Sequence, residues 1–167
     1  MSERPLWAPW RIEYITGPKP GECVFCKAAS AGQEGKVYER PLERGERCFT
    51  LLNAFPYTSG HVMVAPYRHV ARLEDLDNEE LTELMQLARH AVYAQRRSMS
   101  PDGFNVGVNL GKVAGAGIAD HLHMHVVPRW EGDNSFMPVL ADIKVIPQAL
   151  EATYDALARA LGDPSSS

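Results

Sequence analysis

The sequence has little of what marks membrane-spanning, secreted or nucleic-acid-binding chains. No segment approaches the ~20 consecutive apolar residues of a transmembrane helix, and the first ten residues do not resemble a signal peptide. Lysine and arginine are outnumbered by acidic residues, 17 to 21, and form no run, which argues against a basic face for duplex nucleic acid. We therefore expect a cytoplasmic protein that binds neither membrane nor nucleic acid, while a nucleotide held in a pocket stays open.

Cysteine is also scarce, with only Cys23, Cys26 and Cys48. An odd number in a chain without an export signal argues against a disulfide framework. Cys23 and Cys26 form a Cys-x-x-Cys pair, which is typical of metal or redox sites. His69 and one histidine of the row described below are candidate partners for a tetrahedral zinc site. By spacing alone, the pair is equally consistent with two thiols that pack in the hydrophobic core.

The chain predicts one domain with an irregular arm in front of it. Its 167 residues, 45% of them hydrophobic, suffice for one core. Residues 1–21 carry Trp7, Trp10 and four prolines, which predict an arm that packs on the body. Residues 22–162 are expected to form the single domain and residues 163–167 a disordered tail.

Apolar periodicity predicts an α+β fold with a mainly antiparallel sheet, because most connections between strands are short. Before the histidine row, strands are expected at 37–40, 48–53, 61–65 and 104–110, with a charged turn at 43–47. A long amphipathic helix is predicted over 73–97, with Asp77 and Glu80 as a capping box, and a closing helix over 147–161. The apolar stripe of the long helix consists of Leu81, Leu84, Met85, Ala88, Ala91 and Val92, and it fades at Gln95.

Three of the six histidines stand in one row, His121, His123 and His125, alternating with apolar residues. This period of two predicts a strand with the imidazoles on one face, and Pro128 is expected to end it. Same-face positions lie about 6.6 Å apart, so one metal ion is not easily held by all three. Metal binding and nucleophilic catalysis remain open, and the spacing favours His123 as the central group.

A glycine-rich loop, residues 111–117, leads into the histidine row. Its unobstructed backbone N–H groups can form a nest for phosphate oxygens, although it has neither the P-loop ending nor the Rossmann spacing. The combination suggests phosphoryl or nucleotidyl transfer to His123. The alternative is a hairpin whose histidines are merely exposed.

These motifs resemble those of the histidine triad (HIT) superfamily. Residues 121–127 match its defining motif, Asn53 with residues 60–69 looks like its second signature, and residues 23–27 are similar to the opening motif of many bacterial members. The flanking segments 7–11, 128–137 and 144–148 resemble the bacterial diadenosine tetraphosphate phosphorylase branch. The resemblance implies an HIT-like homodimer that cleaves dinucleoside polyphosphates through a nucleotidyl-histidine intermediate.

The resemblance also implies a role for each site residue. His123 would be the nucleophile at the α-phosphate, His125 would contact the leaving oxygen, and His61 and His121 would support them. The implied nucleotide-binding residues are Asn53 for ribose, Asn109, Gly115 and Gly117 for phosphate, and Val24, Phe25 and Leu51 for the base. The implied zinc ligands are Cys23, Cys26, His69 and His121.

Gly117 bears on which acceptor completes the reaction. Hydrolytic members resembling the fragile-histidine-triad enzymes carry a glutamine at this position, and the smaller glycine leaves room for inorganic phosphate to attack instead of water. Phosphorolysis of diadenosine tetraphosphate would yield ADP and ATP. The alternatives are a dinucleoside polyphosphate hydrolase, a purine nucleoside phosphoramidase, a nucleotide-binding protein without catalysis and a zinc-stabilised structural module.

Overall fold

The computed structural model describes residues 21–32, 34–133 and 149–162. Nearly all of the expected N-terminal arm, including Trp7 and Trp10, therefore lies outside the described residues. The same holds for residues 134–148, which include the end of the flanking segment 128–137 and all of the segment 144–148, and for the expected tail at 163–167.

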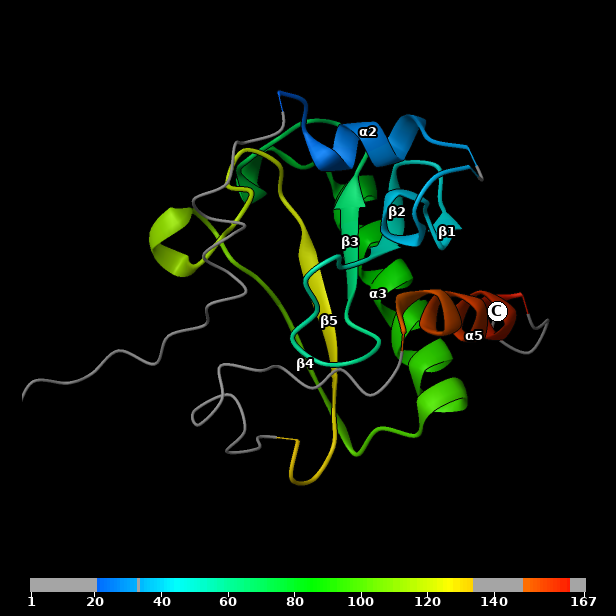
Figure 1. Ribbon diagram of the computed structural model, residues 1–167. Coiled ribbons are helices and arrows are strands. Elements are labelled where there is room, and N and C mark those ends of the chain that lie inside the picture. The colour runs from blue at the N-terminus through cyan, green and yellow to red at the C-terminus, as the bar shows by residue number, and fades with distance from the viewer. Residues whose placement is uncertain (1–20, 33, 134–148, 163–167) are drawn as a thin grey trace, which may run out of the picture.

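The described residues build one antiparallel sheet flanked by helices (Figure 1). Its strands are β1 (Glu43–Arg44), β2 (Cys48–Leu52), β3 (Val62–Pro66), β4 (Gly103–Val108) and β5 (Met124–Arg129), in the order β1-β2-β3-β5-β4. The helices are α2 (Val24–Ser30), α3 (Asn78–Met99) and α5 (Leu150–Leu161), with short 3-10 turns η1 (Val37–Glu39), η2 (Leu73–Asp75) and η3 (Lys112–Ala114). The predicted α+β class with an antiparallel sheet is confirmed.

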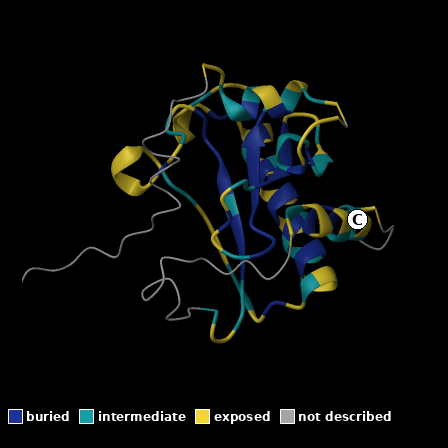
Figure 2. Cartoon of the chain, viewed as in Figure 1, coloured by how far each residue is buried: buried dark blue, intermediate teal, exposed yellow. Residues whose placement is uncertain are grey.

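The central strand β3 separates two layers of core, and all five of its residues are buried (Figure 2). Because side chains alternate across a strand, Val62 and Val64 join the cluster that α3 and α5 cover. Met63 and Ala65 belong to a second cluster, which contains Phe25 of α2. The face that α2 only partly covers is the one available for a site.

Helix α3 begins where its capping box places it. The carboxylate of Asp77 accepts from the amide of Glu80 at 2.7 Å, and the carboxylate of Glu80 accepts from the amide of Asp77 at 3.0 Å. The predicted capping box is thus confirmed, while the predicted start at residue 73 is wrong, since residues 73–75 form the separate turn η2. Among the described residues, no helix is long and apolar enough to cross a membrane.

The predicted apolar stripe of α3 is wrong at two positions. Met85 is 55% exposed, whereas Gln95 is fully buried. The side-chain amide of Gln95 donates to the carbonyls of Gly60 (2.8 Å) and Val126 (3.2 Å). A polar residue is accommodated there because its amide N–H groups have partners, as buried donors require.

Three further local predictions are corrected. Residues 37–39 form the turn η1 instead of a strand, with the Glu39 carboxylate accepting from the Lys36 amide, and Glu43–Arg44 pairs as β1 inside the predicted turn. Helix α2 was not predicted; seven residues make only a marginal isolated helix, and tertiary packing of Phe25 holds it.

Pro128 does not end the histidine strand but lies inside β5, opposite Phe104 of β4. Pairing with β3 stops at Val126, so a proline is tolerated where the strand has only one neighbour. His121 and His123 precede β5, which begins at Met124, and only His125 lies in the strand.

Candidate active site

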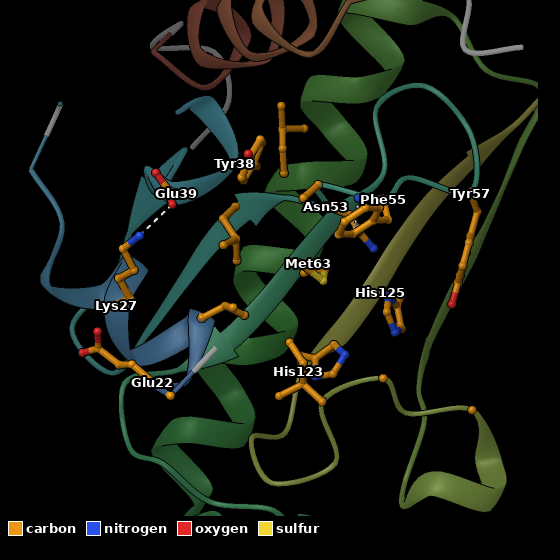
Figure 3. A pocket seen from close by; sticks show the side chains of 18 residues that line it. Glu22, Lys27, Tyr38, Glu39, Asn53, Phe55, Tyr57, Met63, His123 and His125 are labelled. Carbon is orange, nitrogen blue, oxygen red and sulfur yellow. Dashed lines mark hydrogen bonds and ion pairs between the residues drawn. The ribbon is translucent and has the colours of Figure 1, made fainter. Parts of the chain in front are cut away.

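A cavity of about 510 Å³ opens on the α2 side of the sheet (Figure 3). Its floor follows from the strand register, which sets Leu51 of β2 opposite Met63 of β3, and Met63 opposite His125 of β5. Of the residues that the resemblance implied, the cavity is lined by Val24, Leu51, Asn53, Gly115, Gly117, His123 and His125. Phe25 and Asn109 do not line it.

Phe25 instead lies against the histidines. Its ring is fully buried, with its centroid 4.7 Å from that of His123 and 5.0 Å from that of His121. Asn109 lines a second cavity, which shares Tyr57 and His125 with the first.

Several lining residues were not singled out from the sequence. They are Tyr38, Phe55, Tyr57, Met63 and Ile118, together with the ion pair between Lys27 and Glu39 (2.7 Å). Met63 alone had a usable signal, because period-two alternation sets it on the same face as His61. Lys27 reaches the cavity from helix α2, which was not predicted, and the others from turns and loops, where the sequence gives no register.

The backbone fixes the tautomer of His123. Its Nδ1 lies 2.8 Å from the carbonyl oxygen of His121, and since a carbonyl only accepts, Nδ1 carries the hydrogen. The lone pair of the neutral ring is therefore on Nε2. The side chain is 5% exposed, and this burial lowers the pKa of His123 below its usual value. The neutral form of the ring, with a lone pair on Nε2, is therefore favoured at pH 7.

His61 and His125 form a pair whose tautomers are set by a backbone amide. The N–H of Tyr57 donates to Nδ1 of His61 at 3.1 Å, so the neutral ring carries its hydrogen on Nε2. That Nε2 donates to Nδ1 of His125 at 2.9 Å, which puts the hydrogen of His125 on Nε2. The rings of His123 and His125 are 4.9 Å apart. The site thus combines a lone pair with a neighbouring N–H donor.

Asn53 follows β2 at the edge of the cavity, and its orientation is also fixed. Its Oδ1 accepts from the amide of Phe55 at 2.8 Å, and its Nδ2 lies 3.4 Å from Nδ1 of His61. Since the carbonyl oxygen is taken by the backbone, the amide hydrogens are what Asn53 can offer a ligand.

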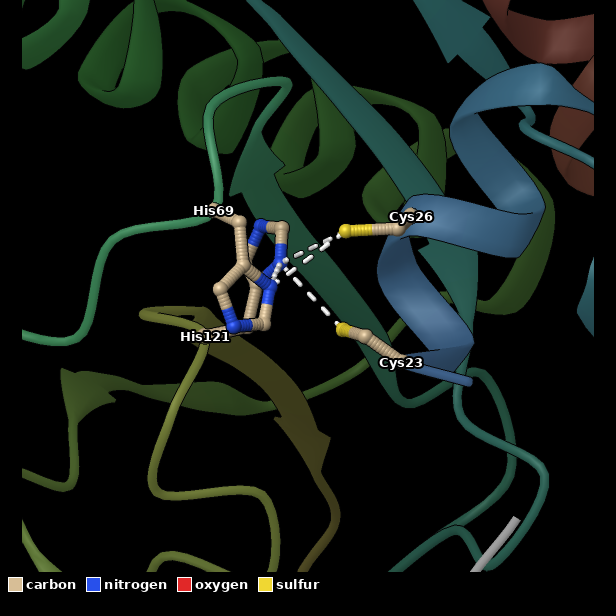
Figure 4. A group of neighbouring side chains, drawn as sticks. All are labelled: Cys23, Cys26, His69 and His121. Atoms are coloured by element: carbon tan, nitrogen blue, oxygen red, sulfur yellow. Dashed lines mark hydrogen bonds between the residues drawn. The ribbon is translucent and has the colours of Figure 1, made fainter. Parts of the chain in front are cut away.

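The four residues implied as zinc ligands converge in space (Figure 4). Their ligand atoms, Sγ of Cys23 and Cys26 with a ring nitrogen of His69 and His121, all lie within 4.8 Å of one another. Nδ1 of His121 is 3.3 Å from Sγ of Cys23 and 3.2 Å from Nδ1 of His69. Zn–S bonds of about 2.3 Å and Zn–N bonds of about 2.0 Å give a tetrahedron with edges of roughly 3.3–3.8 Å. The donor set fits a zinc ion.

His121 is oriented for this cluster by its second nitrogen. Nε2 donates to the carbonyl of Pro66 at 2.9 Å, so the lone pair of the neutral ring is on Nδ1, facing the thiols. A carbonyl that fixes the tautomer of a ligating histidine is the usual outer-shell arrangement. Burial lowers the pKa of His121 to about 4, which keeps the ring neutral, as a metal ligand must be.

Comparison with known proteins identifies relatives of this chain. A relative from Mycobacterium tuberculosis (strain CDC 1551 / Oshkosh) named "AP-4-A phosphorylase" is 40% identical over 163 residues, covering 92% of this chain and 82% of the relative. A relative from Dictyostelium discoideum named "Bis(5'-adenosyl)-triphosphatase" is 36% identical over 88 residues, covering 53% of this chain and 58% of the relative. The crystal structure of a Zn-bound histidine triad family protein from Mycobacterium smegmatis matches this fold with a TM-score of 0.67. The two sequences are 30% identical, and the match covers 84% of this chain and 93% of that one.

The family itself is identified by its domain. The family model described as "HIT domain" matches residues 34–132, more than half of the chain. The matched region contains the whole sheet and all of the histidines discussed above. The chain therefore belongs to the HIT domain family.

Proposed function

We propose that the protein cleaves dinucleoside polyphosphates such as diadenosine tetraphosphate by transferring a nucleotidyl group to His123 and then to inorganic phosphate. The observation that carries this proposal is the pair of complementary tautomers. Nε2 of His123 has a lone pair because Nδ1 is bonded to a carbonyl, and Nε2 of His125 has a hydrogen because Nδ1 accepts from His61. The relative named "AP-4-A phosphorylase" supports the substrate class.

The two steps balance as follows. The lone pair on Nε2 of His123 forms a bond to the α-phosphorus, and the bond from that phosphorus to the bridging oxygen breaks. The departing ATP takes the electron pair, while the N–H of His125 stabilises the charge that develops on its oxygen. An oxygen of inorganic phosphate then bonds to the same phosphorus. The phosphorus–nitrogen bond breaks, ADP leaves, and the electron pair returns to Nε2.

The cavity offers matching surroundings for the nucleotidyl half. Val24 and Leu51 provide apolar walls for a base, and Asn53 offers amide hydrogens to a ribose hydroxyl. Gly115 and Gly117 line the same cavity. We assign the phosphate position to this loop, with Gly117 as the space through which the acceptor phosphate approaches.

We also propose that Cys23, Cys26, His69 and His121 hold one zinc ion with a structural role. When bound, zinc would fix α2, which contributes Cys23 and Cys26 at its start, to two other segments, because His69 comes from the loop after β3 and His121 from the segment before β5. Zinc analysis of protein purified without a histidine tag should give about one ion per chain. Cys26→Ser should lose it and Cys48→Ser, which lies outside the cluster, should retain it; equal zinc content in both variants would contradict the assignment.

A homodimer is proposed through β4. This strand is the last on its side of the sheet, and Asn105, Val106 and Gly107 in its middle are exposed. An edge strand of this kind can pair with a second copy. Sedimentation should give a dimer, and Val106→Lys should shift the chain toward a monomer; a wild-type monomer at micromolar concentration would refute the proposal.

The central experiment is turnover of diadenosine tetraphosphate with and without radiolabelled inorganic phosphate. Phosphorolysis predicts label in ADP, unlabelled ATP, and no turnover when phosphate is omitted. His123→Asn should lower the rate by several orders of magnitude, whereas His90→Asn, which replaces a histidine bonded to Glu43 outside the cavity, should not. Equal turnover without phosphate would identify a hydrolase instead, and cleavage of adenosine phosphoramidate alone a phosphoramidase.

A further inference from the structure

A second cavity of about 440 Å³ lies beside the first. Two residues, Tyr57 and His125, line both cavities, so the two spaces meet at the N–H donor of His125. His123 lines the first cavity only. The second cavity therefore begins beyond the side chain that faces the leaving oxygen in the proposed function.

The register of β4 and β5 defines its floor. Gly107 is opposite His125, and Asn105 is opposite Val127, so these four residues share the face of the sheet that carries the first cavity. At about 3.3 Å per residue, the floor extends roughly 13 Å from His125 to Arg129. It can accept several phosphate groups or a nucleoside.

The far wall is polar and rigidly held. Arg129 makes two hydrogen bonds to the carboxylate of Asp133, at 2.6 and 2.7 Å, and a third to Oδ1 of Asn105 at 2.8 Å. This last bond orients the amide, so that Nδ2 is the donor Asn105 can offer. Asn109 lines the same cavity. The wall therefore has one oriented hydrogen-bond donor, Nδ2 of Asn105, and a second amide, that of Asn109, both suited to phosphate oxygens and sugar hydroxyls.

We propose that this second cavity binds the half of the dinucleoside polyphosphate that leaves, with its phosphates near His125 and its nucleoside toward Arg129. The inference rests on the proposed function. Displacement at phosphorus places the nucleophile and the leaving oxygen roughly in line, on opposite sides. With the transferred nucleotide in the first cavity beside His123, the departing chain passes His125 into the second.

A substitution at Gly107 can fill the second cavity without disturbing the strand. A Cβ built there meets no atom within 4 Å, and its backbone is not in the left-handed region. A β-branched residue is favourable in a strand, so Gly107→Val should fold normally while projecting into the second cavity. Gly103→Val is the matched control, because Gly103 lies in the same strand with equal free space but does not line the cavity.

The test is calorimetric binding of two ligands, AMP and a methylene-bridged diadenosine tetraphosphate that resists cleavage. Gly107→Val should raise the Kd for the dinucleotide by roughly ten-fold or more and leave the Kd for AMP unchanged. Gly103→Val should change neither Kd. Sedimentation of both variants checks that the association state is unaltered.

The other outcomes separate the two proposals. The second site would be overturned if Gly107→Val bound the dinucleotide as tightly as wild type, or if its affinities for AMP and for the dinucleotide fell equally. Either result would leave the proposed function intact. Wild-type protein that binds neither nucleotide would overturn the proposed function, and the second site with it.

Discussion

The carboxylate of Glu83 and the glycine at position 45 form a coupled pair whose energetics can be worked out from the structure. Glu83 reaches from α3 to the turn between β1 and β2, where it accepts from three consecutive amides, those of Glu46 (2.9 Å), Arg47 (2.6 Å) and Cys48 (2.6 Å). A Cβ at Gly45 would lie 2.6 Å from the carboxylate carbon. The side chain at 45 must therefore be absent for the carboxylate to hold the turn.

The two single substitutions should both destabilise the fold. In Glu83→Ala the amides of exposed Glu46 and Arg47 can turn to water, but that of buried Cys48 loses its partner, so we expect a loss of about 2–4 kcal/mol. In Gly45→Ala the methyl group displaces a carboxylate that three hydrogen bonds hold, which costs about 1–3 kcal/mol.

In the background of Glu83→Ala, the effect of Gly45→Ala on the free energy of unfolding should change sign. The φ angle of Gly45 lies outside the left-handed region, so with Glu83 removed the alanine gains only the reduced entropy of the unfolded chain. Gly45→Ala should then stabilise by about 0.4–1 kcal/mol. Urea unfolding of the four proteins at equal protein concentration measures each free energy. An identical effect of Gly45→Ala in the two backgrounds would refute the reasoning.

Three further outcomes are expected. Hydrogen bonds from Arg68 hold the pKa of buried Glu80 below its ordinary value. Glu80→Gln should therefore be less stable than wild type above pH about 4.5, and this difference in the free energy of unfolding should close as the pH falls through the folded-state pKa. A difference that does not change with pH would contradict this. Gly60→Ala should lose about 1–2 kcal/mol by thermal unfolding, because φ is +80° and the new Cβ would lie 2.5 Å from Sδ of Met99. Met85→Glu should change stability by less than about 0.5 kcal/mol in the same assay, since the side chain is exposed.

One local signal in the sequence predicted structure correctly. The capping box of Asp77 and Glu80 involves residues three positions apart and forms as expected. Gln95 shows the opposite case, because its two acceptors, the carbonyls of Gly60 and Val126, come from segments far along the chain. The helical period places position 95 on the apolar stripe, whereas the polarity of glutamine predicts that the stripe ends there. Only the tertiary structure supplies the partners that allow this side chain to be buried.

The site follows the same division. The identities of the histidines and cysteines could be taken from motifs, and the structure brings the four proposed zinc ligands together. The second cavity had no sequence signal, since it depends on which residues of β4 lie opposite β5. The register of two strands separated by a long loop is set by the whole sheet.

The structure also resolves how one residue can serve both the proposed metal site and the proposed nucleophile. The side chain of His121 offers Nδ1 to the thiols and bonds Pro66 through Nε2, while its backbone carbonyl fixes the tautomer of His123. The two duties use different atoms and do not compete. A substitution at position 121 would remove a zinc ligand but keep the carbonyl that fixes the tautomer of His123. The proposed zinc would therefore act on the nucleophile by holding residue 121 in place.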